Sequence, residues 1–128
     1  LTGNFERGAQ IKLEYFGLWD YFRAGAFGDA RPDRNGLLHD AIERVALAGG
    51  PRVHPRDVVI VGDTPLDVAV AVAGGARSLA VATGGYAVDA LLKSGADAAL
   101  EDLTDKEAVL RGLGVTAGPE SIRAGHER

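Results

Sequence analysis

Short apolar runs rich in β-branched and small residues alternate along the chain with longer stretches in which apolar residues recur every three or four positions. The first pattern is typical of buried strands, and the second of amphipathic helices. We predict helices over residues 5–16, 34–48, 68–73, 87–94 and 102–113, strands over 24–27, 58–61, 78–82 and 98–100, and the end of another strand at 1–2. Strands that alternate with helices build βαβ units, so we predict an α/β fold, a parallel sheet with helices on both faces.

Several residues suit the ends of these helices. We expect Asn4 to cap the first helix and Gly17 to end it in the left-handed conformation. Thr104 and Glu107 have the spacing of a capping box for the last helix. We expect the aromatic run at residues 18–22 to form a packed corner.

The most informative stretch is residues 58–67, V-V-I-V-G-D-T-P-L-D. Its uninterrupted apolar run predicts a strand buried on both faces, and Pro65 suits the first turn of a helix. Asp63 and Asp67 therefore follow the carboxyl end of a strand, where open α/β sheets bind their ligands. Two carboxylates suit a hard cation such as Mg²⁺. The alternative is that Asp63 caps the helix and Asp67 is a solvated first-turn acid.

Two further stretches suit the binding of an anion such as phosphate. Thr2 ends a predicted strand, and its hydroxyl, with the N–H groups of the turn at Gly3 and Asn4, would cradle a phosphate at a helix N-terminus. Arg34 begins the second predicted helix and could neutralise phosphoryl charge or hold an attacking carboxylate ionised. The alternative for Arg34 is a solvated surface residue.

Composition narrows the function classes. A net charge of −4 and a pI near 5.3 argue against nucleic-acid and membrane-surface partners. The absence of Cys excludes disulfides and thiolate metal sites and is compatible with a cytoplasmic location. We expect one domain over residues 1–114 and a mobile tail over 115–128, and we give His126 in that tail no role. The chain has no Met and opens on Leu1, so we expect it to be a fragment of a longer protein.

In this order, the three stretches resemble the haloacid dehalogenase (HAD) superfamily, in particular its phosphoglycolate phosphatase-like branch. Residues 1–4 resemble the second motif of that family, a strand-end Thr or Ser. Residues 62–67 resemble the fourth, the acidic metal motif, and residues 80–86 are similar to the strand and loop that usually follow it. The resemblance covers roughly residues 1–103.

The resemblance implies a Rossmann-like core and Mg²⁺-dependent hydrolysis of the phosphate monoester of a small phosphorylated metabolite through an aspartyl-phosphate. It assigns a role to each candidate residue: Thr2, Gly3 and Asn4 would hold the phosphate, Thr2 and Arg34 would take part in catalysis, and Asp63 and Asp67 would hold Mg²⁺. The substrate itself would be selected by a cap domain, which this chain does not contain.

The chain departs from the family pattern at two motifs. The third motif normally supplies a Lys, whereas only Arg31 and Arg34 occur near Pro32. We favour Arg34 because it begins the helix, with Arg31 as the alternative, and Arg is not equivalent to Lys. The first motif, D-x-D-x-[TV], is absent, so we expect the nucleophilic Asp upstream of Leu1. The missing strand would be central, so we expect this fragment alone to be inactive and another segment or a second chain to complete the sheet.

Two other readings compete with a phosphatase. A non-catalytic α/β module could bind a phosphorylated ligand or partner without turning it over, which the absent nucleophile favours and the Asp63/Asp67 pair disfavours. A receiver domain would need a Lys late in the sheet, but Lys93 lies in a predicted helix. A dehalogenase is less favoured, because those members generally do without Mg²⁺.

Overall fold

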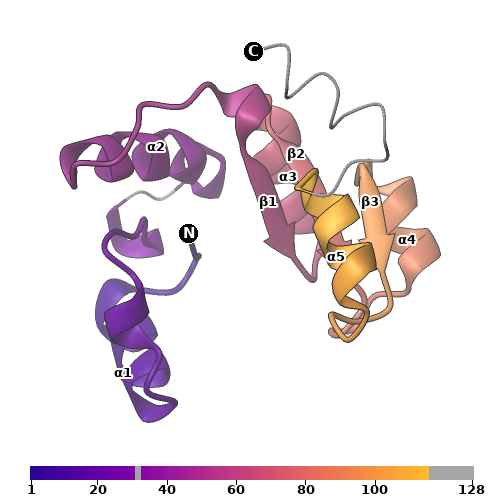
Figure 1. Cartoon of the computed structure of the whole chain (residues 1–128), viewed down its shortest axis with the longest axis horizontal. Helices are drawn as coiled ribbons and strands as arrows, with labels where there is room; N and C mark the ends of the chain where they lie inside the picture. Colours follow the sequence, from indigo (N-terminus) through magenta and orange to yellow (C-terminus); the bar gives the residue numbers. More distant parts are fainter. Residues whose placement is uncertain (31–32, 116–128) are drawn as a thin grey trace. The chain divides into compact units, whose positions relative to one another are not determined.

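The computed structural model describes residues 1–30 and 33–115 (Figure 1). These residues divide into two units, one made of residues 1–58 and 69–77 and the other of residues 59–68 and 78 onward, and each is described by itself. The helices are α1 (Glu6–Tyr15), α2 (Leu37–Leu47), α3 (Pro65–Gly74), α4 (Val88–Lys93) and α5 (Lys106–Leu113), and the strands are β1 (Val59–Gly62), β2 (Arg77–Val81) and β3 (Ala98–Leu100). Short 3-10 turns lie at Trp19–Tyr21, Gly28–Ala30, Arg34–Gly36 and Pro55–Asp57.

The sheet of the second unit has the strand order β1-β2-β3, with β2 parallel to β3 (Figure 1). Successive residues of a strand point to opposite faces. On one face, Leu79 of β2 contacts α5, because a Cβ added at Gly112 would lie 2.8 Å from its Cδ1. On the other, Ala80 packs with Val68 of α3 and Leu91 of α4. Helices therefore cover both faces, which confirms the predicted α/β fold.

Strand β1 is less enclosed than its sequence predicts. Ile60 is buried, but Val61 is 49% exposed. The strand lies at the edge of the three-stranded sheet and pairs with β2. The prediction of burial on both faces is therefore wrong for Val61, since an edge strand has fewer neighbours to cover it.

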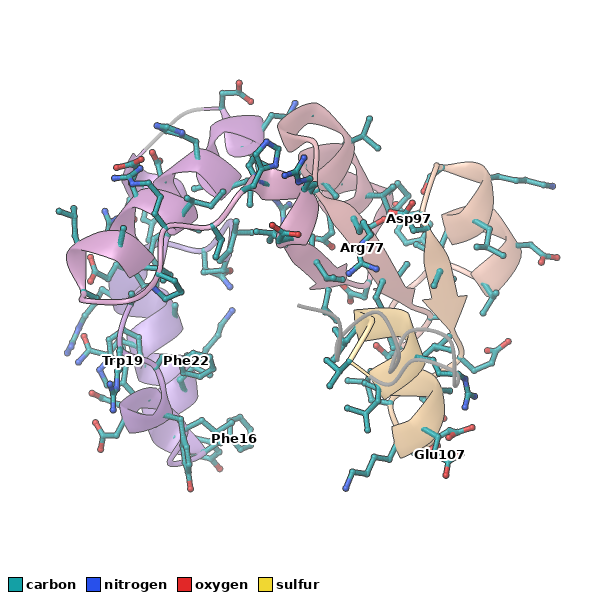
Figure 2. All side chains as sticks on the ribbon, turned by 45° about the horizontal axis from the view of Figure 1, so that its top comes forward. Phe16, Trp19, Phe22, Arg77, Asp97 and Glu107 are labelled. Atoms are coloured by element: carbon teal, nitrogen blue, oxygen red, sulfur yellow. The ribbon has the colours of Figure 1, made fainter. Side chains whose placement is uncertain are left out.

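A reciprocal pair of hydrogen bonds fastens the turn before β3 to the start of β2. The backbone N–H of Ser78 donates to Oδ2 of Asp97 at 2.8 Å, and the N–H of Asp97 donates to the Ser78 hydroxyl at 3.3 Å. Ser78 is only 3% exposed, and Asp97 is labelled in Figure 2. The polar groups of the buried Ser78 are thus hydrogen-bonded, and these bonds support the register of β2 and β3.

The first unit is built around α2 and two paired backbone segments. Leu37, Leu38 and Ile42 of α2 are buried. The N–H of Thr2 donates to the carbonyl of Ala26 at 3.0 Å, and the N–H of Gly28 donates to the carbonyl of Asn4 at 2.9 Å. Both segments advance in the same direction along these bonds, so they pair in parallel. Neither segment forms a regular strand, so the predicted strand at 24–27 and the predicted strand end at 1–2 are present only as paired extended backbone.

Helix α1 is not capped as predicted. Its N-cap is Phe5, which forms no side-chain cap bond. The side-chain amide of Asn4 instead donates a hydrogen bond from Nδ2 to the Thr2 Oγ1 at 3.1 Å. The first-turn N–H of Glu6 donates to Oδ1 of Asp29 at 3.2 Å. The capping oxygen therefore comes from a loop far along the chain, which also ties α1 to the paired segments.

The capping box predicted for the last helix is also wrong. Asp105 is the N-cap of α5 and accepts the Ala108 N–H at 3.1 Å. Thr104 is engaged by Asp102, which accepts its N–H at 2.9 Å and its hydroxyl at 2.5 Å. These hydrogen bonds from Thr104 lower the pKa of the Asp102 carboxyl. Asp is as good an N-cap as Thr, so the local sequence did not distinguish the two positions.

The predicted packed aromatic corner is mostly exposed. Tyr21 is 80% exposed and Phe22 is 60% exposed. Trp19 is half-buried, with its ring centroid 6.4 Å from that of Phe27. Phe16, Trp19 and Phe22 are labelled in Figure 2, at and after the end of α1. A cavity of about 530 Å³ lies beside Trp19 and Phe22 within the first unit. Over the described residues, no helix has both the length and the apolar character that crossing a bilayer requires.

Replacing Gly28 with Ala is expected to destabilise the first unit by about 1–3 kcal/mol, the usual cost of overpacking. A Cβ at this position would overlap the carbonyl group of Gly3, and backbone atoms cannot rotate away as a side chain can. Thermal or denaturant unfolding measures the effect. The matched control is Gly8→Ala within α1, where the described residues leave open space. It should be neutral or stabilising, because Ala is the better helix former. Equal stabilities for the two variants would contradict the pairing of the two segments.

Candidate functional site

The predicted metal loop joins β1 to α3 in the second unit. Gly62 ends β1, as predicted. Helix α3 begins at Pro65, in line with the first-turn position expected for that proline but before the predicted range of 68–73. Oδ2 of Asp67 accepts the Thr64 N–H at 3.1 Å and the Thr64 hydroxyl at 2.9 Å. These bonds hold the half-buried Asp67 carboxylate across the turn at the helix start. Asp67 is an acid of the first turn of α3, as the alternative expects, but it is half-buried and hydrogen-bonded and not a solvated residue.

The exposed Asp63 carboxylate lies against the loop that follows β2. A Cβ added at Gly84 would be 2.7 Å from Oδ2 of Asp63 and 3.3 Å from its Cγ. Within residues 1–30 and 33–115, no group of three or more His, Cys, Asp or Glu side chains gathers as a complete ligand set. One or two carboxylates nevertheless fit Mg²⁺, which keeps several waters and takes further oxygens from a substrate phosphate.

The predicted phosphate turn lies in the first unit. The hydroxyl oxygen of Thr2 accepts the backbone N–H of Asn4 at 3.1 Å and its side-chain amide at 3.1 Å. A hydroxyl has two acceptor lone pairs and one donor hydrogen. Both lone pairs are therefore engaged, and the hydrogen is the part of Thr2 that can be donated to an anion.

Arg34 lies against this turn. A Cβ added at Gly3 would be 3.2 Å from the guanidinium Cζ of Arg34 and 3.3 Å from its Nε. Arg34 is half-buried and begins the short 3-10 turn that leads into α2. The structure therefore brings Arg34 to the turn formed by Thr2, Gly3 and Asn4, which is far from it in the sequence. This contact supports Arg34 as the cation of the site; the alternative, Arg31, lies outside the described residues, as does His126.

Sequence reasoning missed a second cation at this turn. Nζ of Lys12 donates to Oδ1 of Asn4 at 3.5 Å. Lys12 is on α1, two helical turns beyond Asn4, so its side chain reaches back over the first turn of the helix. Helical spacing from the phosphate turn could have identified it. Its positive charge would add to the attraction of an anion to this turn.

Comparison with known proteins places these residues in a family. The family model described as HAD-hydrolase-like matches residues 33–106, which is more than half of the chain. The chain belongs to this family. The HAD-hydrolase-like match includes Arg34, Asp63, Asp67 and Gly84, whereas the turn at residues 2–4 lies before it.

A solved structure supports the HAD-like fold over a longer stretch. The chain is similar to the crystal structure of a predicted phosphatase from Clostridium acetobutylicum, with a TM-score of 0.71 and 21% sequence identity. The similarity covers 86% of this chain and 50% of that protein, so the chain spans about half the length of its structural neighbour. No curated protein matches the chain significantly.

Proposed function

We propose that this chain is part of a Mg²⁺-dependent hydrolase of phosphate monoesters that acts on a small phosphorylated metabolite. The observation that carries the proposal is the loop after β1, which presents the exposed Asp63 carboxylate and, in the first turn of α3, the Asp67 carboxylate at the carboxyl end of the strand. Family membership and a structural neighbour described as a predicted phosphatase support it. As part of the same proposal the protein is cytoplasmic, in line with the absence of Cys.

Asp63 and Asp67 would hold the metal ion, Asp63 with a carboxylate open to solvent and Asp67 from its position across the turn. Two carboxylates without a third acidic ligand among the described residues match the way Mg²⁺ is usually bound. When bound, the ion would neutralise negative charge on the phosphoryl group. Most of the rate enhancement in phosphoryl transfer comes from positioning and charge neutralisation of this kind.

The residues of the first unit would bind the phosphoryl group. The Thr2 hydroxyl would donate its hydrogen to a phosphoryl oxygen, and the backbone N–H of Gly3 would donate to the same phosphoryl group. Asn4 would hold the Thr2 hydroxyl in place, since its N–H is donated to the hydroxyl oxygen. Arg34, which lies against Gly3, would place a permanent positive charge beside them. That charge would stabilise the transition state and keep a nearby attacking carboxylate ionised.

The nucleophile is proposed to come from a D-x-D segment outside these 128 residues. The Asp oxygen would attack phosphorus while the neighbouring acid gives its proton to the departing alcohol. Water would then cleave the acyl phosphate, which releases inorganic phosphate and restores the Asp. The chain described here would contribute the phosphate turn, the cation and the metal loop to that reaction.

We expect the protein as its source makes it to release inorganic phosphate from para-nitrophenyl phosphate or a sugar phosphate when Mg²⁺ is present, and to lose this activity when EDTA removes the ion. Phosphate release measures the reaction directly. Tight binding of phosphorylated ligands without any turnover would instead favour a non-catalytic binding module.

A further inference from the structure

The loop after β2 contains two adjacent glycines in different surroundings. A Cβ at Gly84 would meet three atoms of the Asp63 side chain, at 2.7 Å from Oδ2, 3.3 Å from Cγ and 3.5 Å from Cβ. Around Gly85, no described atom outside its chain neighbours lies within 4 Å of the same position. The Asp63 side chain, with its Oδ2 foremost, thus occupies the space that a side chain at residue 84 would need, whereas the corresponding space at Gly85 is open.

Backbone conformation does not explain why residue 84 is a glycine. Gly84 does not belong to the glycines of this chain that have positive φ, so an L-residue could adopt its φ. The loop is also anchored close by, because the N–H of Ala82 continues the ladder to the carbonyl of Leu100 at 2.8 Å. The constraint at Gly84 is therefore the space that the Asp63 carboxylate occupies.

We propose that Gly84 is a positioning residue for Asp63: the absence of a side chain lets the loop close against the carboxylate and fixes the direction in which its oxygens point. This inference rests on the metal role of Asp63 in the proposed function. A methyl group at residue 84 would clash with the Asp63 side chain. Rotation of that short side chain would relieve the clash and leave the backbone in place. The fold would persist, and the ligand oxygens would be redirected.

The test compares Gly84→Ala with its neighbour Gly85→Ala in the protein as its source makes it. Calorimetric titration with Mg²⁺ alone, without substrate, measures binding, and thermal unfolding measures stability. We expect Gly84→Ala to weaken Mg²⁺ binding by about 10- to 100-fold, the usual range for residues that orient a metal ligand. Gly85→Ala should bind Mg²⁺ as the unmodified protein does, and neither variant should lower the Tm.

A double-mutant cycle shows whether Gly84 acts through Asp63. In an Asp63→Asn background, Gly84→Ala should have no further effect on Mg²⁺ binding, because the group that it redirects has already lost its charge. Equal binding by Gly84→Ala and Gly85→Ala would overturn the inference, as would a lower Tm for Gly84→Ala alone. If Asp63→Asn itself leaves Mg²⁺ binding intact, the proposed metal role fails instead, so the two failures are distinguishable.

Discussion

Replacing Asp63 with Asn is expected to lower Mg²⁺-dependent turnover by about 100-fold or more, the scale of losing one strong electrostatic contact to the transition state. Asn preserves the size of the side chain but removes the negative charge that a hard cation selects. Asp63 is the exposed acid of the loop after β1, with its carboxylate held against Gly84. Phosphate release at varied Mg²⁺ concentration measures both the rate and the apparent affinity for the ion.

Two other acids of the chain make this result specific. Asp89→Asn, at an exposed first-turn acid of α4 in the same unit, should leave activity unchanged. Asp67→Asn should cause a smaller loss than Asp63→Asn, because an amide oxygen can still accept the two hydrogen bonds from Thr64. Should Asp63→Asn retain the full rate and the same Mg²⁺ dependence, Asp63 would not be a ligand of the ion.

The features predictable from the sequence depend on local chemistry. Pro65 begins α3, because its fixed φ suits the first helical turn. Gly17 follows α1 with a φ of 67°, a conformation that costs glycine little. The alternation of strands and helices fixes the fold class, and the loop at residues 62–67 lies at a strand end because the preceding apolar run forms β1.

Contacts between distant residues could not be predicted in this way. Asp29 supplies an oxygen to the first turn of α1, and Gly84 receives the carboxylate of Asp63. Neither pair has a spacing that sequence periodicity describes, since both arise from how segments meet in the fold. The same limit applies to Arg34, whose helix-start position suggested a cation but not its contact with Gly3.

The exposure of individual apolar side chains could not be predicted from the sequence either. Val61 and Phe22 are apolar, but the first is 49% and the second 60% exposed. Burial of an apolar side chain stabilises the folded state, but the identity of the residue does not say whether a neighbour covers it. Whether a strand is central or at an edge depends on the order of strands in the sheet, which local patterning leaves open.

Replacing Arg34 with Ala is expected to lower kcat/KM for phosphate monoesters by about 10²- to 10³-fold, the usual cost of removing one charge-stabilising donor. Arg34 is half-buried, and its Cζ would lie 3.2 Å from a Cβ added at Gly3, in the turn that Thr2 and Asn4 form. Its positive charge therefore lies beside the turn where we propose that a phosphoryl group is held. Steady-state kinetics and competition by inorganic phosphate measure the loss, and Arg56→Ala at an exposed arginine of the same unit is the control.

Conservative replacement separates the charge of Arg34 from its shape. Arg34→Lys keeps a positive charge but loses the planar guanidinium that lies against Gly3, so we expect activity between that of the Ala variant and the unmodified protein. Arg31→Ala should have little effect if Arg34 is the cation of the site. The opposite ranking, a severe loss in Arg31→Ala with near-normal activity in Arg34→Ala, would transfer the role to Arg31. The contact between Arg34 and Gly3 would then serve packing of the turn, because a half-buried arginine stem stabilises its surroundings without taking part in catalysis.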